Sequence, residues 1–271
     1  MSQFRMALLQ MSVKGGDKAR NLAHAAEMVQ EAAADADVAI LPEAMDVGWT
    51  HPSAAIEASP IPDGDTCVHL RRLAKEYGIY LCSGLVERDG EEVFNSAVII
   101  DPQGDVLLTH RKLNELEIGH AYYGQGDRLG VCQTELGTLG LMICADAFAK
   151  DHVISRSLGY MGADILLSPG SWAVKPDHDN EKTPYGDTWR NCYIPVAKEF
   201  DMWIVGVSNV GPITEGPWKG RKCIGCSMVV DPNGAEILQG PYGVNAETIL
   251  YVDIEPQPRP ARGCGWTQTC K

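Results

Sequence analysis

The sequence has no long apolar run and no cluster of basic residues, and each absence excludes a class of protein. The longest apolar runs in the 271 residues, such as residues 38–41, fall far short of the roughly 18 residues that a membrane-spanning helix needs. Lys and Arg total 23 against 36 Asp and Glu, which gives a net charge of −13, and no basic cluster with interleaved aromatics offsets it. We therefore expect no nucleic-acid partner and no membrane partner.

A secretory leader and a disulfide framework are missing as well. Residues 4–11 are apolar but short, are interrupted at Gln10 and have no small-residue cleavage site, so they predict a first strand. The nine cysteines are an odd number, and most of them lie in apolar segments, where free cysteine behaves as a small hydrophobic residue. We expect reduced thiols and a cytoplasmic protein.

Short aliphatic or β-branched runs alternate with helical stretches along the chain, and the pattern occurs twice. The first half predicts strands and helices, in chain order, over residues 6–11, 19–35 (helix), 38–41, 67–77 (helix), 79–87, 93–101 and 106–110. The second half predicts them over residues 139–143, 152–161 (helix), 164–169, 188–200 (helix) and 202–208, with a further run over 227–234. Asp231-Pro232-Asn233-Gly234 repeats Asp101-Pro102-Gln103-Gly104 at an offset of 130 positions.

This repeat predicts an α/β fold of the α-β-β-α type, a four-layer sandwich built from two similar halves whose sheets bury their free faces against each other. We assign residues 1–253 to this single domain. Residues 254–271, with three prolines, predict an extended C-terminal arm that crosses a partner subunit, so we expect a homodimer or a higher homo-oligomer. The alternative is two separate small α/β domains, but no Pro/Gly/Ser-rich linker divides the chain at residues 128–140.

Three residues at predicted strand ends could carry chemistry together. Cys144 lies between a strand and a helix, where backbone N–H groups favour a thiolate. Glu43 follows the buried run 38–41 through Pro42, where desolvation raises a carboxyl pKa into the range of a general base. Lys112 follows the strand 106–110. Each residue alone is more often structural or solvated, but the set suits acyl transfer through a thioester.

In this interpretation Glu43 takes the thiol proton while Cys144 attacks a carbonyl or nitrile carbon. Lys112 and the backbone N–H of Ala145 then stabilise the oxyanion.

The segments that carry these residues resemble the three signature segments of the carbon–nitrogen hydrolase (nitrilase) superfamily. They are Leu41-Pro42-Glu43, Arg111-Lys112 and Ile143-Cys144-Ala145-Asp146, in that order. Further landmarks, including Asn95-Ser96-Ala97 and Gly126-Asp127, extend the resemblance over about residues 6–252. The resemblance implies the nitrilase-like sandwich, with Glu43 as general base, Lys112 as stabiliser of the tetrahedral intermediate and Cys144 as nucleophile. It implies a hydrolase that needs no metal and no organic cofactor.

The resemblance also implies a second glutamate in the loop after the lysine, where it positions the substrate or the attacking water. Glu115 and Glu117 both qualify. We prefer Glu117 because it is nearer to Gly126-Asp127.

The substrate class is less sharply defined by the sequence. Relatives that act on nitriles commonly follow the cysteine with Trp-Glu, whereas this chain has Ala145-Asp146, which favours a small linear amide or an N-carbamoyl compound and the amidase-like branch. The alternatives are a nitrilase acting on a small nitrile and a non-catalytic binding protein with the same fold. Apart from the backbone of Ala145, the candidate residues for the substrate pocket are His120, Tyr122, Tyr123, Trp172 and Trp189, which could equally be core residues.

Two rival sites have weaker support. Cys223 and Cys226, with Cys264 and Cys270, could bind zinc, but the second pair has the wrong spacing. A papain-like hydrolase needs a histidine beside Cys144, and neither His110 nor His120 has a recognisable context for that role.

Overall fold

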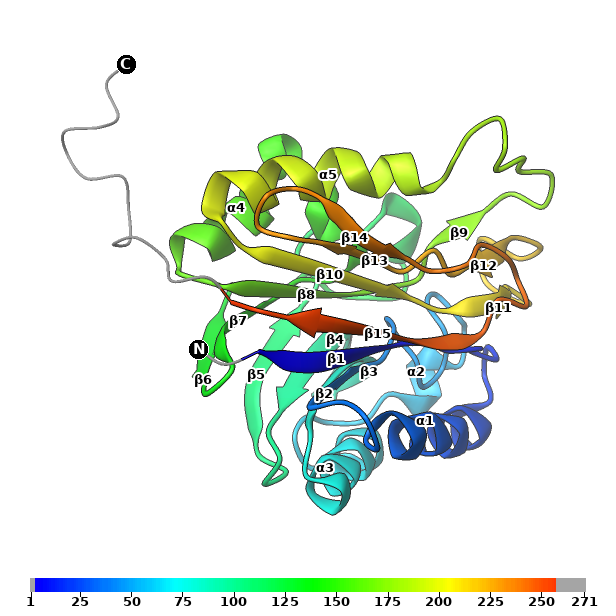
Figure 1. Cartoon of the computed structure of the whole chain (residues 1–271). Coiled ribbons are helices and arrows are strands. Elements are labelled where there is room, and N and C mark those ends of the chain that lie inside the picture. The colour runs from blue at the N-terminus through cyan, green and yellow to red at the C-terminus, as the bar shows by residue number, and fades with distance from the viewer. Residues whose placement is uncertain (1–2, 257–271) are drawn as a thin grey trace.

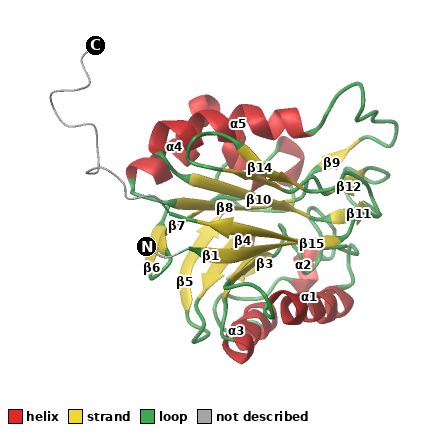
Figure 2. Ribbon diagram, viewed as in Figure 1, coloured by secondary structure: helices red, strands yellow, loops and turns green. Residues whose placement is uncertain are grey.

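The protein consists of two six-stranded sheets that lie face to face, with helices on both outer faces (Figure 1). The computed structural model describes residues 3–256. Figure 2 shows α1 and α3 below the first sheet and α4 and α5 above the second. The predicted α-β-β-α sandwich is confirmed.

The first sheet has the strand order β15-β1-β2-β3-β4-β5. β1, β2 and β3 are parallel, whereas β15, β4 and β5 each join an antiparallel neighbour. The bounds of its strands and helices are β1 (Phe4–Gln10), α1 (Lys18–Ala32), β2 (Val38–Ile40), α2 (Ala54–Glu57), α3 (Asp65–Tyr77), β3 (Tyr80–Asp89), β4 (Glu92–Ile100), β5 (Val106–Arg111) and β15 (Thr248–Ile254).

The second sheet repeats this arrangement in the order β6-β7-β8-β10-β13-β14, read from the matching edge. β7, β8 and β10 are parallel, and β6, β13 and β14 join antiparallel neighbours. The bounds are β6 (Val131–Thr134), β7 (Gly137–Leu141), α4 (Val153–Tyr160), β8 (Ile165–Gly170), α5 (Gly186–Phe200), β10 (Trp203–Ser208), β13 (Met228–Val230) and β14 (Glu236–Gln239). The two halves predicted from the repeat therefore have the same topology.

Alternating side chains explain why the sheets stack. Along β8, Ile165 and Leu167 face the other sheet, while Leu166 between them packs under the helices. Along β1, Met6 and Leu8 face the second sheet, and Leu9 packs under α1 and α3. Because side chains of a strand point to opposite faces in turn, each sheet contributes one face to a core that both halves share.

Some elements were not predicted. β15 pairs with β1 along seven residues, so the last described strand belongs to the first sheet. A small third sheet, in the order β11-β12-β9, joins β9 (Ala173–Val174), β11 (Val210–Pro212) and β12 (Lys222–Ile224). The predicted arm over 254–271 falls outside the described residues from position 257 onward. Among residues 3–256, none of the helices has the length and apolar character needed to cross a membrane.

Candidate active site

Three strand ends meet at one edge of the sandwich, and a reactive side chain follows each of them. β2 and β3 are parallel, and β5 runs in the same direction because it is antiparallel to β4, which is itself antiparallel to β3. Glu43 follows β2, Lys112 follows β5, and Cys144 follows β7 in the second sheet. At this edge the backbone N–H of Glu43 donates to the carbonyl of Gly170, 3.3 Å away at the end of β8. The fold thus brings the three predicted residues to one place.

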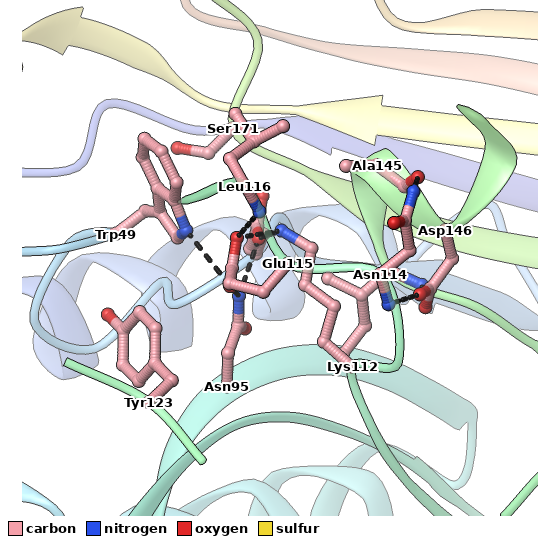
Figure 3. A network of polar contacts seen from close by, with 12 residues as sticks. Trp49, Asn95, Lys112, Asn114, Glu115, Leu116, Tyr123, Ala145, Asp146 and Ser171 are labelled. Atoms are coloured by element: carbon pink, nitrogen blue, oxygen red, sulfur yellow. Dashed lines mark hydrogen bonds and ion pairs between the residues drawn. The ribbon is translucent and has the colours of Figure 1, made fainter. Parts of the chain in front are cut away.

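Lys112 joins two carboxylates in a buried cluster. Its Nζ donates to Oε1 of Glu43 at 2.7 Å and to Oε1 of Glu115 at 3.0 Å. The amide of Asn95, on β4, donates to the same Oε1 of Glu43 at 2.7 Å and to Oε2 of Glu115 at 3.0 Å. The side chains of Glu43 and Lys112 are only 1% and 2% exposed. Figure 3 shows Glu115 between the side chains of Trp49, Asn95 and Lys112.

Trp49 covers this cluster from the loop that follows Glu43. Its ring centroid lies 5.6 Å from Nζ of Lys112, within cation–π range. Its indole N–H points at Oε2 of Glu115 at 3.4 Å, a long hydrogen bond. The aromatic ring therefore limits water access to the charged groups.

The ionisation of the cluster follows from its burial and its unequal charges. Burial raises the pKa of Glu43 above its ordinary value, and the charge of Glu115 raises it further, although Lys112 and Asn95 oppose both effects. Burial alone would lower the pKa of Lys112, but the two carboxylates outweigh it and hold that pKa well above its usual range. One cation facing two carboxylates leaves Glu43 readier to accept a proton than an ordinary surface glutamate.

Cys144 is held in an unusual backbone conformation. It begins a 3-10 turn, η2 (Cys144–Phe148), with φ at +46°, a region that non-glycine residues rarely adopt. The residue is half-buried. Burial and the charge of Glu43 raise the pKa of the thiol well above its ordinary value, while Lys112 and a backbone hydrogen bond from Ser171 lower it. The thiol is therefore protonated near neutral pH, contrary to the thiolate expected from the sequence, because burial and Glu43 outweigh the favourable groups, and it needs a base before it can attack a substrate.

The preference for Glu117 over Glu115 was wrong about which glutamate lies at the cluster. Glu117 begins the 3-10 turn η1 (Glu117–Gly119) and its side chain is exposed. Glu115 lies three residues after Lys112, so its side chain turns back to the lysine, where it is 4% exposed. Proximity in space to Lys112 decides between the two, and distance along the chain from Gly126-Asp127 does not.

The predicted pocket residues separate into two groups. His120 and Tyr123 line a cavity of about 410 Å³ that reaches Glu115. Trp172 and Trp189 stack on each other with centroids 4.1 Å apart, are each 1% exposed, and pack in the core between the second sheet and α5, which carries Trp189. The structure therefore gives the two tryptophans the alternative role, core packing.

Ala145 and Tyr122 complete the set of predicted residues. The side chain of Ala145 is buried, and its backbone N–H follows Cys144 at the start of a 3-10 turn, where the first N–H groups have no acceptor within the turn. Tyr122 packs beside Tyr123, with ring centroids 6.3 Å apart.

Sequence reasoning gave no role to Asn95, Trp49 or Ser171. Asn95 was noted only as part of a landmark segment, yet it bridges both carboxylates. Its position is set by the β3–β4 pairing, in which it lies opposite Val86, and this long-range register has no local signal. Trp49 and Ser171 each come shortly after a strand end, β2 and β8, which is the one pattern that could have suggested them.

The residues of the two rival sites, the papain-like histidine and the zinc cysteines, have other neighbours in the structure. His110 bonds through Nε2 to Oδ2 of Asp146 at 2.7 Å, and no contact with Cys144 is found for it among the described residues. Cys223 lies 3.7 Å from Oγ of Ser171, and Cys226 packs in the core under α5. Cys264 and Cys270 lie outside the described residues.

Comparisons with known proteins point to one family. The carbon-nitrogen hydrolase family profile matches residues 5–259. The chain is 33% identical over 273 residues to omega-amidase NIT2 of Danio rerio, covering 95% of this chain and 90% of the relative. It is 29% identical over 241 residues to a nitrilase of Pyrococcus abyssi, covering 86% and 83%. The solved structure of Saccharomyces cerevisiae Nit3 matches with a TM-score of 0.80 at 22% identity, covering 94% of this chain and 90% of that one.

Proposed function

The chain belongs to the carbon–nitrogen hydrolase family, and on this basis we propose that it hydrolyses a small linear amide or N-carbamoyl compound through a cysteine thioester. The observation that carries the proposal is the buried ion-pair cluster beside Cys144, in which Lys112 contacts both Glu43 and Glu115. A structural ion pair needs one carboxylate for each cation. In this cluster one lysine faces two carboxylates, so negative charge remains on Glu43 to accept the proton of the neighbouring thiol, which suits general-base activation.

The first half of the reaction forms the thioester. Glu43 accepts the proton of the Cys144 thiol as the sulfur attacks the carbonyl carbon, and the carbonyl π electrons move to oxygen. Lys112 has three N–H donors, of which two meet Glu43 and Glu115, so the third can stabilise the oxyanion together with the N–H of Ala145. When the intermediate collapses, the C–N bond breaks and the departing amine or ammonia takes the proton from Glu43.

The second half releases the acid. Glu43 takes a proton from water, which attacks the thioester carbon, and Glu115 lies where it can orient that water through the Lys112 and Asn95 contacts. The C–S bond then breaks, and the sulfur recovers its proton from Glu43. The enzyme returns to its starting state without any external oxidant or reductant.

The substrate class rests on two lines of support. The named omega-amidase relative is 33% identical over nearly the whole chain, and Ala145-Asp146 replaces the Trp-Glu pair that the resemblance links with nitriles. A nitrile remains the second candidate because the Pyrococcus relative carries the name nitrilase.

A substrate panel tests the proposal. Small linear amides, N-carbamoyl amino acids and small nitriles are incubated with the purified protein, ammonia release is measured, and the intact mass is recorded during turnover. We expect ammonia release from amides or carbamoyl compounds and an acyl adduct that peptide mapping places on Cys144. Ammonia release from nitriles alone would replace the amidase proposal, and release without a Cys144 adduct would contradict the thioester.

We also propose that the protein acts in the cytoplasm as a homo-oligomer. The seven cysteines within the described residues are all free, which supports a reducing compartment. Light scattering measures the assembly, and a monomer at micromolar concentration would contradict the oligomer.

A further inference from the structure

A buried carboxylate beside the site makes contacts that the proposed reaction does not use. Asp146 is fully buried, and its two oxygens accept four hydrogen bonds. Oδ2 accepts from Nε2 of His110 at 2.7 Å and from the N–H of Ile143 at 2.8 Å. Oδ1 accepts from the N–H groups of Leu113 at 3.1 Å and Asn114 at 2.8 Å. We call Asp146 with these four partners the Asp146 bridge.

The Asp146 bridge encloses both reactive segments. His110 and Leu113 lie on either side of Lys112 in sequence, and Ile143 and Asp146 lie on either side of Cys144. The amide of Asn114 adds a second link, from Nδ2 to the carbonyl oxygen of Ala145 at 2.6 Å. Figure 3 shows Asn114, Ala145 and Asp146 together beside Lys112. The lysine of the first half and the cysteine of the second are thus joined through one carboxylate.

In the described part of the chain, the bond to Asp146 is the one hydrogen bond found for the His110 ring. Its side chain is 1% exposed, and its Nδ1 has no hydrogen-bond partner among residues 3–256. Burying an imidazole with one nitrogen unpaired costs free energy. The bond to Asp146 offsets part of that cost and orders the backbone segments that Asp146 binds. That bond and the three backbone N–H groups match a carboxylate that stays ionised, and although burial opposes it, the pKa of Asp146 is below its ordinary value.

We propose that His110 and Asp146 are positioning residues, which fix the separation between Nζ of Lys112 and Sγ of Cys144 through the Asp146 bridge. The proposal rests on the proposed function, since it concerns the geometry of the same reaction. His110 touches no reacting atom in this scheme. It holds Asp146, and Asp146 holds the two backbone segments that carry the lysine and the cysteine.

The test compares two substitutions of His110. His110→Leu removes the donor, whereas His110→Gln retains an N–H that can reach the place of Nε2. His69→Leu is the matched control, because His69 is a half-buried histidine on α3 that bonds to the carbonyl of Leu22 at 3.1 Å and weakly to Arg72, away from the site. For each variant, kcat, KM and the rate of Cys144 alkylation by iodoacetamide are measured from pH 6 to 10, with circular dichroism as a check of folding.

We expect His110→Leu to lower kcat about 10- to 100-fold with KM nearly unchanged, because small displacements of reacting groups cost rate more than binding. Lys112 lowers the pKa of the Cys144 thiol, so a looser Lys112 moves the alkylation profile to higher pH and slows alkylation at pH 8 by about threefold or more. His110→Gln should recover most of both quantities, and His69→Leu should change neither.

Several results would overturn the proposal. A folded His110→Leu variant with unchanged kcat and an unchanged alkylation profile would do so, as would a loss that His110→Gln does not recover. If His110→Leu fails to fold, Asn114→Ala decides the question, because Asn114 is half-buried and its amide supplies the second link. A fall in kcat with a shifted alkylation profile supports the Asp146 bridge, and wild-type values contradict it. If the unsubstituted protein hydrolyses nothing in the panel, the proposed function fails, while the alkylation profiles still decide the positioning.

Discussion

The two halves of the sandwich share a strand order but bring different chemistry to the edge where they meet. β2 and β8 occupy equivalent places, yet Glu43 follows β2 and Gly170 ends β8, and the backbones of these two residues touch. The first half contributes the charged groups Glu43, Lys112 and Glu115. The second half contributes Cys144, the proposed nucleophile, whose thiol is neutral.

This difference teaches how a duplicated fold can carry a site that is not duplicated. The topology brings two sets of strand ends together, and the residues that follow those ends decide which half holds charge. Keeping the thiol and the charged groups in different halves has a physical advantage. A thiol packed among apolar side chains stays protonated until the carboxylate that faces it accepts its proton. The predictions below test this division of roles, from the largest expected effect to the smallest.

The strongest test removes the nucleophile of the second half. Cys144→Ala should lower amide hydrolysis by at least about 1,000-fold, since no thioester can form, and should leave the fold intact. Cys192→Ala is the matched control, because Cys192 is a buried cysteine of the same half, on the core-facing side of α5. Ammonia release and intact mass are the measurements, and full activity in Cys144→Ala would refute the proposed mechanism.

The base of the first half comes next. Glu43→Gln should lower kcat by about 10²- to 10⁴-fold, because the amide cannot accept the thiol proton. In the unsubstituted protein the base must be ionised, and its pKa is raised by burial, so activity should fall on the acidic side at a pH above the usual glutamate range. The pH profile of kcat/KM measures this limb. An acidic limb at the ordinary carboxyl pKa, or an active Glu43→Gln variant, would show that another group is the base.

The third test separates the two candidate glutamates of the loop after Lys112. Glu115→Gln should lower kcat about 10- to 100-fold, because it loosens Lys112 and disturbs the position of the attacking water. It should also move the acidic limb to lower pH, since the charge of Glu115 raises the pKa of Glu43. Glu117→Gln, an exposed neighbour, should change kcat less than about twofold. The reverse order would restore the preference that the sequence suggested.

The same comparison shows what the sequence could predict. The repeat predicted the topology, because equivalent strands recur in the same order in both halves and the Asp-Pro turns lie 130 positions apart, and contiguous motifs located Glu43, Lys112 and Cys144. The sequence favoured Glu117 by its distance along the chain from Gly126-Asp127, whereas the chain turns back after β5 and brings Glu115 to Lys112.

The contacts that assemble each half around the site could not be predicted for a further reason. Asn95 reaches Glu43 and Glu115 through the register of β4, and Trp172 meets Trp189 through the packing of α5 on the second sheet. Neither depends on residues close in sequence. Local pattern therefore identifies which residues stand at strand ends, whereas tertiary packing decides which of them touch.

The smallest effect concerns the repeated turns, where the two halves are most alike. Gly104 and Gly234 both have positive φ, +85° and +76°, and both donate to the carbonyl of an aspartate three residues earlier at 2.9 Å. Alanine at either position should cost about 1–2 kcal/mol of unfolding free energy from backbone conformation, with kcat unchanged. A Cβ at position 104 would lie 2.9 Å from the backbone oxygen of Arg71, whereas at position 234 it would meet side-chain atoms, those of Lys198 and, at 3.2 Å, Cγ2 of Ile194, which can move more readily than backbone. Urea unfolding should therefore show the larger loss for Gly104→Ala. Equal losses would mean that backbone conformation alone sets the cost, and a larger loss at Gly234 would contradict the steric difference between the halves.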